Sequence, residues 1–187
     1  MTLIDDFLAD AKEHMAKSVE ATRAKFGSIR AGRASAALLD RVIVDYYGTQ
    51  TPLRQLATIN APEARLITIQ PYDKSAMKAI ERSIQESDLG LTPNNDGAII
   101  RLQIPEMTEE RRREMVKVAR HVAEEGRIAI RNIRRDTMHD LRELRESGEA
   151  GQDDEHRGEE ALQKLTDAEI AEVDAALKAK EAEILEV

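Results

Sequence analysis

The residues of this chain best suited to bind a charged ligand lie between positions 111 and 135. Nine basic residues stand there against the three acidic residues Glu114, Glu124 and Glu125, a local net charge of +6. On a helix that turns about 100° per residue, six of them fall within roughly 60° of Arg113. This stripe consists of Lys117, Arg120, Arg127, Arg131, Arg134 and Arg135. Because the planar guanidinium group matches phosphate geometry and stacks on bases, the stripe indicates a surface for nucleic-acid phosphates.

A second interpretation of the same stripe is the solvated outer face of a helix bundle, and the pattern alone favours it. The side of the helix opposite the stripe is apolar and is expected to pack into the bundle. Its residues are Met115, Val118, Val122, Ala129 and Ile133. Aromatic residues make up 3% of the chain, so a stacking platform for single strands is not indicated. An RNA surface here would act through backbone contacts, shape or arginine stacking.

The motifs give no support to enzyme chemistry. The sequence contains no phosphate-binding loop, no GxGxxG and no GxSxG, and with no cysteine it has neither a disulfide framework nor a thiolate metal site. His139 follows Asp136 and His156 follows Asp153 at a metal-ligand spacing. Metal sites in helix bundles need glutamates that point inward from facing helices, and these histidines do not lie on apolar faces. We therefore expect a protein that is not an enzyme and holds no metal or cofactor.

The formal net charge of −8 is unevenly distributed along the chain. Residues 1–105 are neutral, residues 106–148 carry +1, and residues 149–187 carry −9. The total therefore reflects the C-terminal segment alone, and it does not argue against a nucleic-acid partner for the basic stretch. An adaptor that binds proteins through this acidic segment remains the competing hypothesis.

Nothing in the sequence indicates a membrane or a secretory route. The N-terminal residues Met1 to Asp6 have no basic region, and no apolar run approaches the ~18–20 residues of a membrane span. A soluble intracellular protein is the default expectation.

The pattern of apolar residues changes at Gly32. Residues 3–29 place apolar side chains at the three- and four-residue steps of one helix face. Alternation from Val42 to Tyr47, followed by a turn at Gly48-Thr49, predicts a strand, and residues 66–70 and 98–104 predict two more. A helix is expected from about 75 to 87, and residues 89–97 are a loop by composition. Residues 31–105 therefore predict a small β/α/β unit.

Two further helices follow Pro105. Thr108 is a good N-cap for a helix that meets no strong turn before Ser147-Gly148, and a third helix is expected from about Gln152. Three long helices predict an α+β fold in which an antiparallel three-helix bundle, residues 1–30 plus 106–187, is interrupted by the unit of residues 31–105. The two connections, near 30–35 and 104–108, contain Gly32 and Pro105 and are expected to act as a hinge.

Six short motifs occur in order along almost the whole chain, and together they resemble the ribosome recycling factor family. They are Ile29 to Ser35, Tyr46 to Thr49 with Thr51 to Leu53, Asp88 to Leu91, Thr108 to Arg112, Arg131 to Asp136, and Gln163 to Asp167.

The resemblance implies a translation factor of bacterial type, cytoplasmic and without enzymatic activity, in which the bundle and the small domain form a tRNA-like L shape. Such factors bind the large-subunit face of the ribosome after termination. With elongation factor G and its GTP hydrolysis they split the subunits, so that tRNA and mRNA leave. The implied partners are large-subunit rRNA and elongation factor G, with no DNA and no membrane, and the factor is expected to act as a monomer.

The resemblance also implies which residues contact rRNA. Carried over by position, they are Arg30, Arg33, Arg112, Arg131, Arg134 and Arg135. The last three coincide with the stripe found from spacing, to which spacing alone adds Lys117, Arg120 and Arg127. The small domain and the hinge are implied to face elongation factor G.

Overall fold

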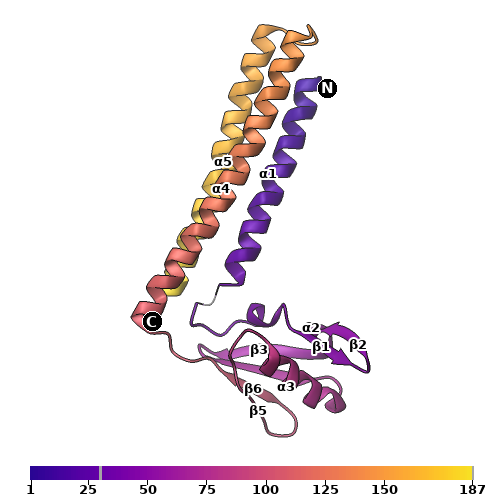
Figure 1. Ribbon diagram of the computed structural model, residues 1–187, viewed down its shortest axis with the longest axis vertical. Helices are drawn as coiled ribbons and strands as arrows, with labels where there is room; N and C mark the ends of the chain where they lie inside the picture. The colour runs from indigo at the N-terminus through magenta and orange to yellow at the C-terminus, as the bar shows by residue number, and fades with distance from the viewer. Residues whose placement is uncertain (30, 187) are drawn as a thin grey trace. The chain divides into compact units, whose positions relative to one another are not determined.

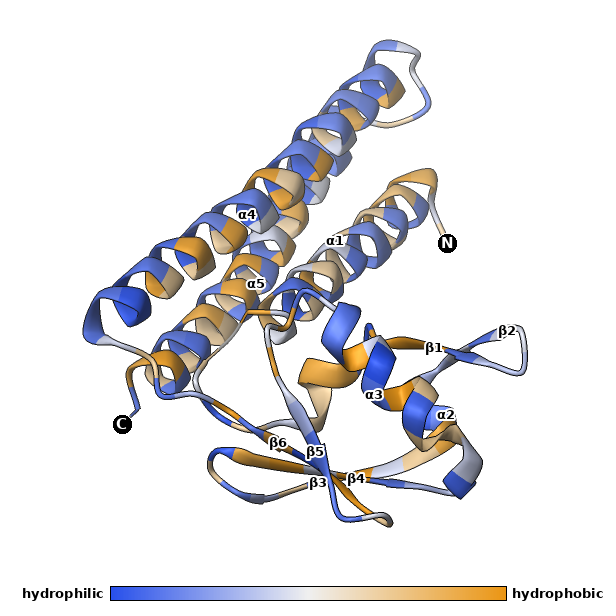
Figure 2. Cartoon of the chain, turned by 60° about the horizontal axis from the view of Figure 1, so that its bottom comes forward, coloured by the Kyte–Doolittle hydropathy of each residue, from blue (hydrophilic) through white to orange (hydrophobic). Residues whose placement is uncertain are grey.

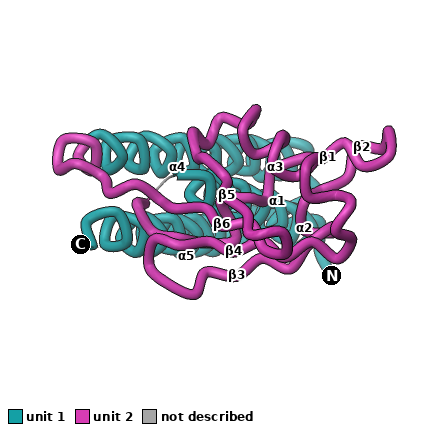
Figure 3. The backbone as a smooth tube through the Cα atoms, turned by 90° about the horizontal axis from the view of Figure 1, so that it is seen from below, with its two compact units in different colours: residues 1–29, 114–187 teal, residues 30–113 magenta. Residues whose placement is uncertain are grey.

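The computed structural model describes residues 1–29 and 31–186, and the chain forms two compact units. Unit 1 comprises Met1–Ile29 and Glu114–Val187, and unit 2 comprises Arg30–Arg113 (Figure 3). Unit 1 is therefore built from two segments that lie far apart in the sequence, and unit 2 is inserted between them.

Unit 1 is made of three long helices, which are α1 (Leu3–Gly27), most of α4 (Glu109–Glu146) and α5 (Gln152–Leu185) (Figure 1). Helix α1 begins with a capping box. The Thr2 hydroxyl accepts from the Asp5 amide at 3.2 Å, and the Asp5 carboxylate accepts from the Thr2 amide at 2.8 Å. These bonds satisfy two amides that a helix start leaves without partners. Each long helix carries alternating bands of hydrophobic and hydrophilic residues (Figure 2).

Close contacts at two glycines fix the directions of the three helices. A Cβ atom at Gly158 of α5 would lie 3.0 Å from Ile4 of α1 and 3.4 Å from Leu141 of α4. A Cβ atom at Gly126 of α4 would collide with the hydroxyl of Thr22, near the other end of α1. Helix α1 therefore runs antiparallel to α4 and parallel to α5. Glycine costs about 1 kcal/mol in a helix interior, and here it permits the close approach of neighbouring helices.

The turn between α4 and α5 follows from a glycine at the end of α4. Gly148 adopts φ +79°, its amide donates to Arg145 O at 3.0 Å, and the Glu149 amide donates to Leu144 O at 2.9 Å. This is a Schellman motif, which satisfies carbonyl groups at the end of the helix. Helix α5 then begins at Gln152 with Gly151 as its N-cap, so the expected start of the third helix is confirmed.

Unit 2 contains an antiparallel four-stranded sheet in the order β3-β4-β6-β5 and a separate hairpin, β1-β2. The strands are β1 (Ile43–Tyr46), β2 (Thr49–Pro52), β3 (Ala57–Glu63), β4 (Leu66–Pro71), β5 (Pro93–Asn95) and β6 (Ile100–Gln103). The helical elements are α2 (Leu53–Leu56), α3 (Met77–Glu86), and the 3-10 turns Ala36–Leu39 and Lys74–Ala76.

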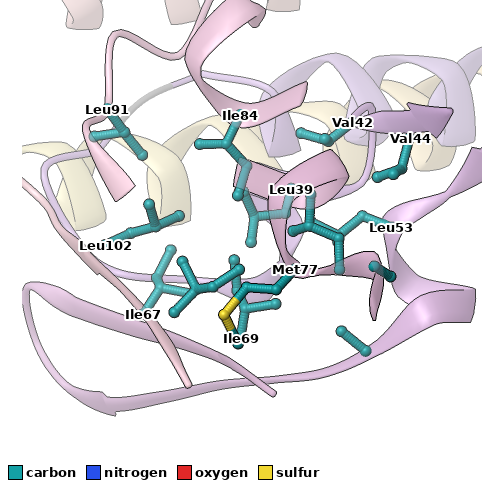
Figure 4. Packing of buried hydrophobic residues seen from close by; sticks show 14 of the residues in the cluster. Leu39, Val42, Val44, Leu53, Ile67, Ile69, Met77, Ile84, Leu91 and Leu102 are labelled. Atoms are coloured by element: carbon teal, nitrogen blue, oxygen red, sulfur yellow. The ribbon is translucent and has the colours of Figure 1, made fainter. Parts of the chain in front are cut away.

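The core of unit 2 lies between the sheet and α3. Ile67 and Ile69 of β4 and Leu102 of β6 are fully buried, since alternate residues of these strands face one side of the sheet. Met77 and Ile84 of α3 are buried in the same cluster, and Figure 4 shows their side chains together with those of the strands. The alternation predicted from the sequence is therefore the feature that builds this core.

Three local expectations for unit 2 were wrong or incomplete. Residues 89–97 are not wholly a loop, because Pro93–Asn95 form β5, an edge strand where proline costs no ladder hydrogen bond. Strand β3 was missed, since five of its seven residues are exposed. The first hairpin turns at Tyr47-Gly48, one residue earlier than expected, and both residues have positive φ, as a type I′ turn requires.

Candidate nucleic-acid interface

The basic stripe predicted from the sequence lies on α4, within unit 1. We call Lys117, Arg120, Arg127, Arg131, Arg134 and Arg135 the arginine face. The buried side of α4 was misplaced by the sequence analysis, because Val118 is 42% exposed. The buried residues are centred roughly 100° from the arginine face rather than opposite it. They are Val116, Ala119, Ala123, Gly126, Ile130, Thr137, Leu141 and Leu144. One edge of the arginine face therefore borders the interior of the bundle.

That edge is paired with α5. Arg120 Nε donates to Glu181 Oε1 at 2.6 Å, and Arg127 Nη2 lies 2.6 Å from Asp174 Oδ1. The Arg127 side chain is only 20% exposed, so its guanidinium group lies in the seam between the two helices. Two cations of the arginine face are thus neutralised by carboxylates of the acidic helix in the free protein.

The other residues of the face are less constrained. Arg131 Nη1 donates to Glu124 Oε1 at 3.1 Å, on the same helix. The pKa of Glu124 is held below its usual value chiefly by the hydrogen bond from Arg127, and next by the one from Arg131. Lys117 and Arg135 are exposed and pair with no group in the part of the chain that the structure describes. These positions present positive charge directly to solvent.

Arg134 differs from its neighbours because its partner is neutral. Its Nη1 donates to the side-chain amide oxygen of Gln163 on α5 at 2.9 Å. Its Nε is buried and has no hydrogen-bond partner among the described residues. A buried donor without a partner is rare in folded proteins and calls for an explanation.

The remaining predicted rRNA-binding residues lie outside unit 1. Arg33 is exposed and Arg112 is half-exposed in the first turn of α4, and both belong to unit 2. Arg30 lies outside the described residues. The structure thus brings six of the nine candidates together on one face of one helix.

The predicted hinge residues lie in two linker segments that run close to each other in unit 2. Gly32 adopts φ +71°, and a Cβ atom on it would lie 3.2 Å from the sulfur of Met107. Both linkers are bonded to the turn between β3 and β4: the Ala34 amide donates to Ala64 O at 2.7 Å, and the Ile104 amide donates to Arg65 O at 2.8 Å. Pro105 is exposed directly after the second of these bonds.

Sequence reasoning missed the residues of α5 that pair with the arginine face. The feature of the sequence that could have identified them is a seven-residue spacing. Arg120, Arg127 and Arg134 are seven residues apart, and so are the acidic residues of α5 at positions 167, 174 and 181. Seven-residue spacing on two antiparallel helices is typical of ion pairs along a coiled-coil seam.

The part of the chain that the structure describes shows neither a metal site nor a membrane-spanning helix. His121, His139 and His156 each lie within 3.5 Å of a glutamate four residues on, all largely exposed. No group of three or more histidine, aspartate or glutamate residues among residues 1–29 and 31–186 could hold a metal ion. Over the same residues, no helix is both long and apolar enough to cross a membrane.

Comparison with known proteins shows similarity along almost the whole chain. The family model described as ribosome recycling factor matches residues 22–185. A ribosome-recycling factor of Rubrobacter xylanophilus is 58% identical over 180 residues, which cover 96% of this chain and 97% of the relative. One of Carboxydothermus hydrogenoformans is 54% identical over 185 residues, which cover 99% and 100%.

Solved structures show the same similarity. A solution structure of the ribosome recycling factor has 40% identity and a TM-score of 0.83, with 100% of both chains covered. A second structure is described as models for the T. thermophilus ribosome recycling factor and the E. coli elongation factor G bound to the E. coli post-termination complex. Its matching chain has 44% identity and a TM-score of 0.71, with 99% of this chain and 100% of that chain covered.

Proposed function

Because the chain belongs to the ribosome recycling factor family, we propose that the arginine face of α4 is the surface with which it binds large-subunit rRNA. The protein is a translation factor and not an enzyme. It binds the post-termination ribosome and, with elongation factor G and GTP, splits it into subunits, which releases tRNA and mRNA for a new round of synthesis.

The observation that carries the rRNA proposal is the gathering of six cations on one helix face with arginine at five of the six positions. Lys117 and Arg135 are exposed and ready for phosphate, while Arg120 and Arg127 must exchange their carboxylate partners for it. The face carries no aromatic residue, so contacts to the RNA backbone and its shape explain the binding better than base stacking does.

Charge reversal in the arginine face tests this proposal. We expect Arg134→Glu to weaken binding to isolated large subunits at least about tenfold, because a charge-assisted contact worth roughly 1.5–3 kcal/mol is replaced by repulsion. The measurement is the dissociation constant across a series of salt concentrations. Each lost phosphate contact also lowers the slope of log K against log salt by about 0.7–0.9.

The matched control is Lys12→Glu, an exposed cation of α1 in the same unit. It makes the same change in net charge and is expected to leave binding nearly unchanged. Equal weakening by both variants would reduce the effect to net charge, and unchanged binding by Arg134→Glu would exclude that residue from the interface. Helicity, followed by circular dichroism, should be the same in all three proteins.

The second part of the proposal concerns the inserted unit. Residues 31–105 form a domain that faces elongation factor G, and it moves relative to residues 1–30 plus 106–187 about the two linkers near 30–35 and 104–108. Support comes from Gly32, whose positive φ and contact with Met107 make the first linker sensitive to any added side chain. The protein acts in the cytoplasm as a monomer, with neither DNA nor a membrane as a partner.

A further inference from the structure

Helices α4 and α5 are joined by a regular series of pairs along their seam. Arg120 pairs with Glu181 and Arg127 pairs with Asp174, so a step of seven residues along α4 matches a step of seven back along α5. The next step brings Arg134 opposite Asp167. The register of the two helices therefore predicts a third ion pair of the same kind.

That third ion pair does not form. Arg134 Nη1 donates instead to Gln163 Oε1 at 2.9 Å, and Gln163 Nε2 donates to Asp167 Oδ1 at 2.8 Å. Gln163 thus stands between the guanidinium group and the carboxylate, and it lies one helical turn before Asp167 on the same helix. The carboxylate of Asp167, which the register places opposite Arg134, therefore accepts a hydrogen bond from Gln163 instead.

The chemistry of the amide fixes its orientation. An amide oxygen accepts and an amide NH2 donates, so only the observed orientation suits both neighbours. Turned over, the NH2 group would face the donors of Arg134 and the oxygen would face the carboxylate. Gln163 is therefore matched to a cation on one side and an anion on the other.

The consequence is a difference in charge among the three seam arginines. Arg120 and Arg127 each have a carboxylate partner, but Arg134 has only an amide. Its Nε is buried without a partner, and its Nη2 is not buried and donates to nothing among the described residues. The positive charge of Arg134 is left uncompensated at the edge of the arginine face, where an anion could accept a hydrogen bond from Nη2.

We propose that Gln163 is a positioning residue that holds Asp167 away from Arg134 and so keeps this guanidinium group available to an RNA phosphate. The inference rests on the proposed binding of rRNA by the arginine face and adds a residue of the acidic helix to it. Asp174 and Glu181 pair with the two other seam arginines, whereas Gln163 interrupts the series at Arg134.

The test is a pair of variants of the full chain. In Gln163→Ala, Asp167 loses its donor and pairs with Arg134 as Asp174 does with Arg127. We expect binding to large subunits to weaken by about two- to fivefold, the range by which one exposed ion pair shifts an equilibrium. In the double variant Gln163→Ala, Asp167→Asn, the competing carboxylate is gone, and binding should return to that of the parent.

Rescue by the second substitution separates this role from a merely structural one. If the double variant binds as weakly as Gln163→Ala, the loss comes from the missing anchor for Arg134 and the proposal is wrong. Unchanged binding by Gln163→Ala contradicts it equally. Thermal melting should remain within about 2 °C of the parent for all variants, since the substituted side chains are exposed.

Two controls complete the design. Glu172→Gln neutralises another acid of α5, one whose partner is Arg23 of α1 at 2.6 Å, and it should leave binding unchanged. Arg134→Glu reports on the proposed function itself. If Arg134→Glu binds normally, Arg134 lies outside the interface and the role of Gln163 fails with it. If Arg134→Glu binds poorly and Gln163→Ala binds normally, only the role of Gln163 is refuted.

Discussion

Gly126 shows how a single residue without a side chain sets the distance between two helices. A Cβ atom there would collide with the hydroxyl of Thr22, a buried residue that is 4% exposed; this hydroxyl donates to Ser18 O at 2.9 Å. Alanine is otherwise about 1 kcal/mol better than glycine in a helix interior. The glycine therefore reflects the packing of α4 against α1, and its cost in helix propensity is offset by that contact.

We expect Gly126→Ala to destabilise the protein by about 1–3 kcal/mol, because the added methyl group overpacks the contact with Thr22. Urea denaturation measures this change. In the double variant Thr22→Ala, Gly126→Ala, the missing hydroxyl leaves room for the new methyl group, and most of the lost stability should be regained. If the two substitutions are additive instead, the collision at Thr22 is not the cause.

At the scale of elements, the hairpin β1-β2 is attached to the start of α3 by two tyrosines in sequence. Tyr46 donates to Asp73 Oδ2 at 2.7 Å, and the Tyr47 hydroxyl lies 2.9 Å from the Ser75 hydroxyl. Asp73 also caps the turn before α3, accepting from the Ser75 amide at 2.9 Å. One carboxylate therefore joins a hairpin that ends at Pro52 to a helix that begins at Met77.

This contact makes the stability of the small unit depend on pH. The hydrogen bond from Tyr46 is the first cause that holds the pKa of Asp73 below its usual value, and the bond to Asp73 raises the pKa of Tyr46. A lowered aspartate pKa stabilises the fold above the unfolded-state value of about 4, and this contribution is lost as pH falls through the folded-state pKa. A raised tyrosine pKa stabilises it below about 10, and this contribution is lost at higher pH.

We expect Tyr46→Phe to be less stable than the parent at pH 7 and the difference to shrink as the pH falls below 4. Chemical denaturation at a series of pH values checks this. The matched control is Tyr72→Phe, which removes a hydroxyl group that is exposed and has no partner among the described residues. A difference that does not change with pH would exclude Asp73 as the acceptor that matters.

The long helices were predictable because their ends carry local signals. Thr2 and Thr108 each accept from the amide three residues on, and Gly148 closes α4 with a positive φ. Strands β3 and β5 were not predictable in the same way, since they are largely exposed edge strands, each defined by pairing with the strand that follows it.

Only the part of the candidate site that lies on α4 was predictable from the sequence. Spacing within α4 finds the arginine face, but it placed the apolar side directly opposite. In the structure the buried side is about 80° closer to the arginine face, measured around the helix axis. Which carboxylates face Arg120 and Arg127 depends on the register of α4 against α5, and register is a property of packing between helices. Gln163 begins the last of the six motifs, but its role toward Arg134 is visible only when that register is known.

At the scale of the whole molecule, the two linkers share one anchor. Ala34 and Ile104 both donate to the turn between β3 and β4, and Gly32 lies against Met107 across the pair. A change in the conformation of one linker therefore alters the contacts of the other. If the proposed hinge is correct, residues in this small region affect how the units move more than how tightly the bundle binds RNA.

We expect Gly32→Val to slow ribosome splitting by elongation factor G and GTP more than it weakens binding to large subunits. The side chain is strained at positive φ and presses on Met107. The matched control is Gly90→Val, which has a similar φ of +63° but no atom within 4 Å of the added Cβ. Equal losses of splitting and binding in Gly32→Val would contradict a mechanical role for this residue.

The parallel course of α1 and α5 decides where a reporter group can be attached. Leu185 ends α5 one turn beyond Glu181, the partner of Arg120, whereas Leu3 begins α1 near the far turn between α4 and α5. With α1 about 37 Å long, a dye or affinity handle at its start stays well clear of Arg120. One fused near Leu185 would lie beside Arg120, at the proposed RNA-binding surface, and binding measured with it would report the handle as well as the protein.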